Sequence, residues 1–178
     1  MEKTLIEPTE YLKNVFKADN VKSESEIIVF VLKKLKELNL VYGRDKEKVF
    51  LNQRPARTAE QILKDGYING CTDDAILFIA AVRSFGLKPI YVEVIEKSWL
   101  ESPMEQNTIR GHAYVEMDDI LVDPQRKIIY IDPDFIKTRY IVFGKANEPF
   151  QLGLTDFKTI VQKFMDFKEK YQAEHKLS

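Results

Sequence analysis

Residues 75–82 are apolar without interruption, and this run constrains the fold more than any other part of the chain. A surface helix keeps a polar face, and this run has none, so it predicts a helix that is buried on all sides. The helix is expected to begin at Cys71 or Thr72. It should end near Phe85, because the following Gly86 is a typical helix terminator.

Short strands are predicted after this helix, because apolar positions change from helical spacing to short runs rich in Val, Ile and Tyr. Further amphipathic helices are expected at residues 23–40, 59–64 and 155–171, the first capped by Ser23 with Glu26 and the second by Thr58. The expected strands, which would form an antiparallel sheet, are residues 90–95, 111–117, 120–122 and 127–131. The pattern predicts an α+β fold with the buried helix packed on the sheet.

Length and charge narrow the function classes. A chain of 178 residues with 44% hydrophobic content suits one domain over residues 1–178. Its 27 basic and 28 acidic side chains nearly cancel, and no basic stripe is interleaved with aromatics, so no nucleic-acid partner is expected. The sequence has no apolar run of signal-peptide or membrane-spanning length, which predicts a cytoplasmic protein without a membrane partner.

Cys71 is the only cysteine, so neither an internal disulfide nor a multi-cysteine zinc site can form. A lone cysteine is often a small buried hydrophobe. Cys71, however, follows Gly70 at the start of the buried helix, where free N–H groups and the helix dipole favour a thiolate. Asp73 and Asp74 oppose this effect by raising the thiol pKa, so catalysis requires a histidine partner.

His112 is the expected partner. The other histidine, His175, lies in the charged tail 172–178, which is expected to fray. Alternation along the strand places His112, Tyr114 and Glu116 on one face, which is predicted to be the polar, functional face.

A two-residue turn at 118–119 would pair Met117 with Ile120 and bring Asp123 onto the face of His112, displaced diagonally. A shift of one residue would move Asp123 to the opposite face. The alternatives in that case are Asp132 and Asp134.

A thiol at a helix N-terminus, an imidazole and an orienting carboxylate are the groups that nucleophilic acyl transfer needs. The N–H of Cys71 is expected to donate to the developing oxyanion. The candidates for a second donor, left open, are Gln53, Tyr67 and Asn69.

Two blocks of the chain resemble the transglutaminase-like superfamily, which includes transglutaminases, peptide N-glycanases and many cysteine hydrolases. Residues 70–86 are similar to its nucleophile helix, with an acidic residue two positions after Cys71, Ala four after, Arg twelve after and Gly fifteen after. Residues 111–116 and the later Asp123-Pro124 resemble its histidine strand and its Asp-Pro. The resemblance covers about residues 58–124.

This resemblance implies a papain-like transglutaminase core in which Cys71, His112 and Asp123 hydrolyse an amide or peptide bond through an acyl-enzyme. It implies a peptide or protein substrate and no cofactor. Two alternatives stay open: a protein-glutamine transglutaminase or deamidase with the same triad, and a non-catalytic binding module of the same fold.

For the remaining notable residues a structural role is expected. Trp99, in the loop 98–109, is expected to be partly buried, with a substrate-groove wall as the alternative. Arg83 is interpreted as structural and Glu116 as solvated or salt-bridged. The acidic pairs at 118–119 and 132–134 lack EF-hand spacing, so no metal is predicted.

Overall fold

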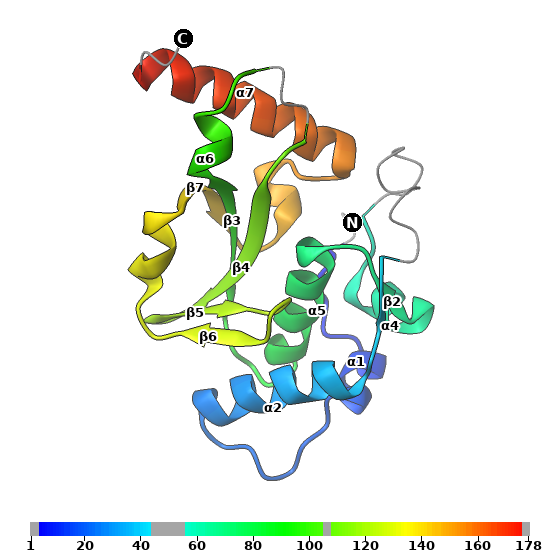
Figure 1. Cartoon of the computed structure of the whole chain (residues 1–178). Coiled ribbons are helices and arrows are strands. Elements are labelled where there is room, and N and C mark those ends of the chain that lie inside the picture. The colour runs from blue at the N-terminus through cyan, green and yellow to red at the C-terminus, as the bar shows by residue number, and fades with distance from the viewer. Residues whose placement is uncertain (1–3, 44–55, 105–107, 176–178) are drawn as a thin grey trace.

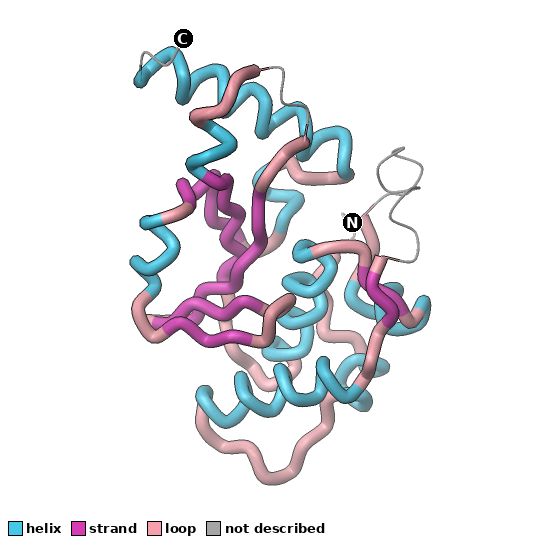
Figure 2. The backbone as a smooth tube through the Cα atoms, viewed as in Figure 1, coloured by secondary structure: helices cyan, strands magenta, loops and turns pink. Residues whose placement is uncertain are grey.

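The computed structural model describes residues 4–43, 56–104 and 108–175, in which helices and short strands follow one another along the chain (Figures 1 and 2). The elements in order are α1 (Glu10–Val15), α2 (Glu24–Glu37), β1 (Val41–Tyr42), α4 (Ala59–Asp65), β2 (Tyr67–Ile68), α5 (Cys71–Arg83), β3 (Ile90–Glu96), α6 (Lys97–Leu100), β4 (Gly111–Met117), β5 (Ile120–Asp123), β6 (Ile128–Tyr130), the 3-10 helix η1 (Pro133–Thr138), β7 (Tyr140–Ala146), the 3-10 helix η2 (Pro149–Leu152) and α7 (Phe157–His175).

Five strands form one antiparallel sheet in the order β6-β5-β4-β3-β7, and β1 pairs with β2 in a separate parallel ribbon. The α+β class is therefore as predicted, and β3 to β6 match the four expected strands. The predicted register of the β4–β5 hairpin is also confirmed, with Met117 opposite Ile120 and Val115 opposite Val122. This register decides which side chains of the hairpin share a face.

Helix α5 is the central helix of the fold. Every residue from Ala75 to Val82 is at most 1% exposed, as the unbroken apolar run predicted. In Figure 1 the helix lies between the sheet and the helices α2 and α4, and it contacts β3 and β4 on its sheet side. The sheet residues that share its core include Tyr91, Ala113 and Val115.

The opposite face of the sheet carries a second apolar cluster. Its members come from four neighbouring strands, β5, β4, β3 and β7, and from η1: Val92, Val94, Tyr114, Leu121, Ile136 and Tyr140. Because both faces are covered, β4 side chains that point either way are buried, as Ala113, Tyr114 and Val115 are. Glu116, near the turn of the hairpin, is only partly buried.

The N-terminal caps predicted for the helices at residues 23–40 and 59–64 are confirmed. Ser23 and Glu26 form a capping box on α2, and Thr58 forms one with Gln61 on α4. Gly66 ends α4 in the left-handed region at φ 73°. The two N-terminal capping boxes satisfy backbone N–H groups that the first turn of each helix leaves unpaired.

The C-terminal helix differs from its prediction. Helix α7 runs to His175, although residues from 172 onward were expected to fray. The His175 ring stacks on Tyr171 at 4.1 Å, and its Nδ1 lies 2.8 Å from the Tyr171 carbonyl oxygen. These contacts within one turn stabilise the last part of the helix.

Several elements were not predicted, among them α1, α6, β7 and the two 3-10 helices. Residues 42–55 were expected to hold at most one short element; β1 falls at their start, and residues 44–55 lie outside the described part of the chain. Within the described ranges no helix has the length and apolar character needed to cross a membrane.

Candidate active site

His112 and Asp123 are joined across the ends of two neighbouring strands. The distance from His112 Nε2 to Asp123 Oδ2 is 2.9 Å, and the residues are 6% and 0% exposed. This contact follows from the β4–β5 register, which places the two side chains on one face as predicted. With Nε2 donating to the carboxylate, Nδ1 is the ring nitrogen that can accept a proton.

Asp123 is held as a carboxylate. Its Oδ1 accepts a 3.0 Å hydrogen bond from the backbone N–H of Arg126, and the Arg126 guanidinium lies 3.6 Å from Oδ2. Burial opposes ionisation, but the hydrogen bonds from His112 and Arg126 outweigh it and lower the pKa of Asp123 below its ordinary value. Asp123 therefore has the charge needed to orient an imidazole and to stabilise its protonated form.

The fallback carboxylates have other roles. Asp132 caps η1 by accepting a 2.9 Å hydrogen bond from the N–H of Asp134. Asp134 forms a 2.6 Å ion pair with Lys137. Both aspartates are exposed.

The face of β4 that carries His112 is not the polar face that alternation predicted. Tyr114 is 2% exposed, belongs to the second apolar cluster, and meets the His112 ring edge-on at 4.7 Å. The prediction was wrong because η1 and the side chains of neighbouring strands, among them Tyr130 and Tyr140, cover this side of the sheet. Tyr114 thus helps to fix the plane of the imidazole by packing.

Cys71 is the first residue of α5 and is partly buried. A hydrogen bond from the backbone N–H of Ala113 reaches its sulfur, so the thiol lies against β4 at the residue after His112. Among the described residues there is no hydrogen bond between Cys71 and His112. The structure brings the three predicted residues to one end of β4 and joins only His112 to Asp123.

The pKa of the Cys71 thiol is raised, contrary to the expectation from its position at a helix start. Burial is the largest cause, followed by the negative charges of Glu93, Asp74 and Asp123; the Ala113 N–H acts in the opposite direction. Desolvation outweighs the helix terminus because it penalises the thiolate directly. Cys71 is therefore a neutral thiol at neutral pH, and its use as a nucleophile requires proton transfer to a base as substrate binds.

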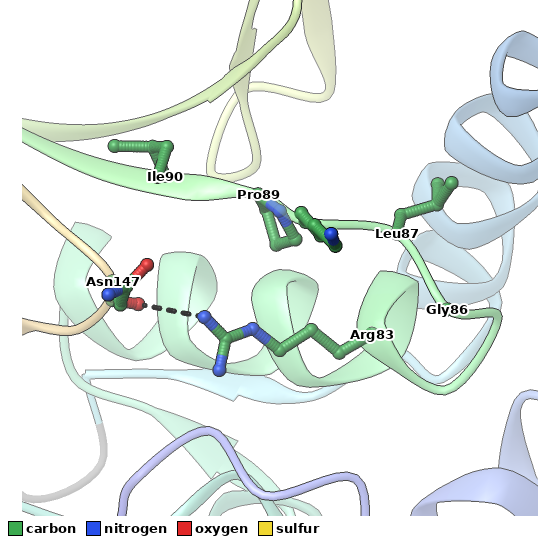
Figure 3. A pocket seen from close by; sticks show the side chains of 7 residues that line it. Arg83, Gly86, Leu87, Pro89, Ile90 and Asn147 are labelled. Carbon is green, nitrogen blue, oxygen red and sulfur yellow. Dashed lines mark hydrogen bonds between the residues drawn. The ribbon is translucent and has the colours of Figure 1, made fainter.

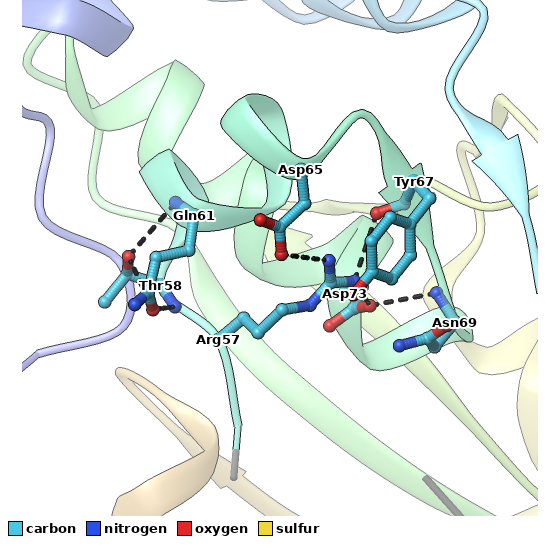
Figure 4. A network of polar contacts seen from close by, with 7 residues as sticks. All are labelled: Arg57, Thr58, Gln61, Asp65, Tyr67, Asn69 and Asp73. Carbon is cyan, nitrogen blue, oxygen red and sulfur yellow. Dashed lines mark hydrogen bonds and ion pairs between the residues drawn. The ribbon is translucent and has the colours of Figure 1, made fainter. Parts of the chain in front are cut away.

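The two aspartates beside Cys71 are each paired with a cation. Asp73 Oδ2 lies 2.6 Å from Arg57 Nη2 and accepts a 2.9 Å hydrogen bond from the N–H of Asn69 (Figure 4). Asp74 Oδ1 lies 3.0 Å from Lys127 Nζ. Burial nevertheless raises the pKa of Asp74 to about 6, with Lys127 acting against it.

Arg57 ties the start of α5 to α4. It donates to Asp65 at 3.0 Å, to Asp73 and to the carbonyl oxygen of Tyr67, and its guanidinium lies 4.1 Å from the centre of the Tyr67 ring. Figure 4 shows the carboxylates of Asp65 and Asp73 converging on the guanidinium. The position of the first turn of α5, and hence of Cys71, depends on this buried cation.

Glu93 is the site residue that sequence reasoning missed. It lies within β3, is 4% exposed, and accepts a hydrogen bond from the hydroxyl of Tyr91. Its charge is the largest electrostatic influence on Cys71 after burial. The signal was present in the sequence, because Glu93 is the single charged residue inside the apolar run 90–95.

The three candidates for a second oxyanion donor lie in different environments. Gln53 lies outside the described residues. Tyr67 is buried, with its carbonyl bound to Arg57. The Asn69 side-chain Oδ1 is buried without a hydrogen-bond partner in the described part of the chain, two residues before Cys71. This oxygen is an acceptor, so it does not mark Asn69 as the second oxyanion donor.

The other residues singled out earlier are structural. Trp99 is 1% exposed in α6, so the groove-wall interpretation is wrong. Glu116 forms an ion pair with Lys145, and Arg83 donates a 3.4 Å hydrogen bond to the carbonyl oxygen of Asn147. Among the described residues no group of three or more His, Cys, Asp or Glu is arranged to hold a metal ion.

A surface pocket lies at the other end of α5. Its lining includes Arg83, Lys88 and Asn147, and Figure 3 shows the Arg83 side chain extending along it towards Asn147. At 1.5 Å per residue, the 13 residues of α5 separate this pocket from Cys71 by about 18 Å. The pocket is therefore not part of the Cys71 site.

No family model matches this chain, and no curated protein or solved structure matches it significantly.

Proposed function

We propose that this protein is a cysteine-dependent hydrolase of amide or peptide bonds, with a papain-like core of the transglutaminase-like type. The observation that carries the proposal is the buried 2.9 Å contact between His112 and Asp123, next to a thiol at the start of the central helix. An oriented imidazole whose Nδ1 has no hydrogen-bond partner among the described residues, near a single cysteine, suits acyl transfer.

The proposed reaction begins with transfer of the Cys71 proton to His112 Nδ1, as the sulfur forms a bond to the substrate carbonyl carbon. The carbonyl electrons move to oxygen, where the backbone N–H of Cys71 donates to the oxyanion. The C–N bond then breaks and His112 gives its proton to the leaving amine. Water, deprotonated by His112, attacks the thioester, and the acid product leaves as the Cys71 thiol is regenerated.

A specific observation favours a second candidate, a binding module without turnover. The thiol pKa is raised and Cys71 makes no hydrogen bond to His112 among the described residues. A raised pKa is compatible with the hydrolase, because contacts between catalytic groups often tighten only when substrate excludes water from the site. An amine in place of water would make the same acyl-enzyme a transglutaminase intermediate.

The test is a mass-spectrometric screen of peptides and cell lysate for cleavage, glutamine deamidation and amine incorporation. Cys71→Ala and His112→Gln should abolish each product, whereas His175→Gln, which changes the exposed histidine of α7, should match the wild type. Cleavage supports the hydrolase, and deamidation or amine incorporation alone replaces it with the acyltransferase. Products that persist in Cys71→Ala, or no product at all, would overturn the proposal.

A further inference from the structure

Glu93 is a buried acid that the proposed reaction does not use. It is 4% exposed in the middle of β3 and faces the core around α5 rather than solvent. A carboxyl group at such a place is costly to ionise, and a fold that keeps one there needs a reason for it.

The β3–β4 register places Glu93 beside the thiol. Glu93 lies opposite Ala113, whose backbone N–H donates to the Cys71 sulfur. Tyr91, two residues earlier on the same face, donates from its hydroxyl to the Glu93 carboxylate and also hydrogen-bonds Thr72, the residue after Cys71. Glu93 is therefore linked to the first turn of α5 in two ways, through Ala113 to Cys71 and through Tyr91 to Thr72.

The other acidic groups around Cys71 differ from Glu93 in having cations. Asp74 is paired with Lys127, and Asp123 with His112 and Arg126. Tyr42, on β1, interacts electrostatically with the thiol, and its hydroxyl oxygen accepts a hydrogen bond from the Gln125 side chain.

Glu93 forms no ion pair with any cation in the described ranges; its partner is the neutral hydroxyl of Tyr91. An added charge on Glu93 therefore acts on Cys71 without a counter-ion to offset it.

We propose that Glu93 is a positioning residue that controls the charge of Cys71: its carboxylate keeps the thiol protonated, and its neutral acid lets the thiol pass its proton to His112. The catalytic meaning of this control rests on the proposed function. The electrostatic effect itself does not, because it concerns the ionisation of a thiol.

The physical basis is that two neighbouring acids in a desolvated site cannot both ionise cheaply. Burial raises the pKa of Glu93 well above that of an ordinary glutamate, and the Tyr91 hydrogen bond acts against this shift. Burial also raises the pKa of Cys71, and a charged Glu93 raises it further. Glu93 loses its proton first and then opposes the second ionisation.

The experiment measures the rate of iodoacetamide alkylation of Cys71 in the full chain between pH 6 and 10. Glu93→Gln keeps the shape of the side chain and removes its charge, so the alkylation profile should shift to lower pH once Glu93 of the wild type is ionised, giving up to about tenfold faster alkylation near pH 9. Glu96→Gln is the matched control on the same strand, where the carboxylate instead faces Arg139 and Arg110. It should follow the wild type.

Tyr91→Phe provides a second variant should Glu93→Gln fail to fold. Without the hydroxyl, the Glu93 carboxylate loses its donor and its pKa rises further, so Cys71 should react faster near pH 9 than in the wild type. Unchanged or slower alkylation in the folded Glu93→Gln protein, or in Tyr91→Phe if Glu93→Gln does not fold, would overturn the inference. Faster alkylation of Glu93→Gln in a protein that turns over no substrate would support this inference and contradict the proposed function.

Discussion

His112 and Asp123 are in contact at 2.9 Å because a two-residue turn fixes the register of the β4–β5 hairpin that carries them. The contact uses Nε2 and leaves Nδ1 for proton exchange with a substrate or a thiol. Its consequences can be measured before any substrate is known.

Asp123→Asn should change the tautomer of His112. In the wild type the carboxylate holds the proton on Nε2, and an amide at this place can donate as well as accept, which weakens that preference. Nitrogen NMR of the imidazole should show protonated Nε2 in the wild type and a mixed or reversed population in the variant. Any hydrolysis found in the substrate screen should fall about 10²- to 10⁴-fold.

Asp134→Asn is the control for this change, since Asp134 is exposed and paired with Lys137. It should leave the tautomer and turnover as in the wild type. Identical imidazole spectra for the wild type and Asp123→Asn would show that Asp123 does not orient His112.

The free energy of unfolding should decrease at low pH as Asp123 becomes protonated. Its pKa is lower in the folded state than in the unfolded chain, so its contribution is present above the ordinary pKa of about 3.9 and is lost as the pH falls through the folded value. Urea unfolding of the wild type and Asp123→Asn at pH 6, 5, 4 and 3 should show a stability difference that shrinks below about pH 4. A difference that stays constant over this range would exclude the linkage.

Arg57→Met should destabilise the fold by about 3–5 kcal/mol, because it leaves Asp73 partly buried without its cation and removes the link to Asp65. Urea unfolding gives the free energy. The control is Arg110→Met, which removes an exposed arginine 4.0 Å from Glu96 and should cost less than about 1 kcal/mol. Equal effects of the two substitutions would contradict the structural role given to Arg57.

Gly111→Ala should disturb both stability and the site. A methyl group at Gly111 would collide with the Phe164 ring of α7 and lie 3.0 Å from the Val94 carbonyl oxygen. Overpacking of this kind costs about 1–3 kcal/mol, and the strain falls on the residue before His112.

Phe164→Leu in the same chain should recover part of the free energy lost in Gly111→Ala, which a double-mutant cycle measures. Gly70→Ala is the steric control, because its backbone is extended and no atom lies within 4 Å of the added methyl. Its unfolding free energy should stay within about 0.5 kcal/mol of the wild type. Additive effects of the two substitutions at Gly111 and Phe164 would rule out the collision.

Local patterns were sufficient for much of the fold. The apolar run of residues 75–82 predicted the buried helix, and the spacing of Ser23 and Glu26 predicted a cap, because both depend on neighbours within a few residues. Strand β7 was missed although its Tyr-Ile-Val-Phe start has strand character. Its edge position beside β3 is a long-range pairing that no local pattern fixes.

For the site, the sequence by itself determined the His112–Asp123 pair, because turn length and the two-residue period of a strand fix which side chains share a face. The charge state of Cys71 was decided only by the tertiary structure. Its helix position predicted a lowered pKa, and burial together with the charge of Glu93 on strand β3 raises the pKa instead. A thiol pKa depends on the solvent and charges around the sulfur, and distant parts of the chain supply both.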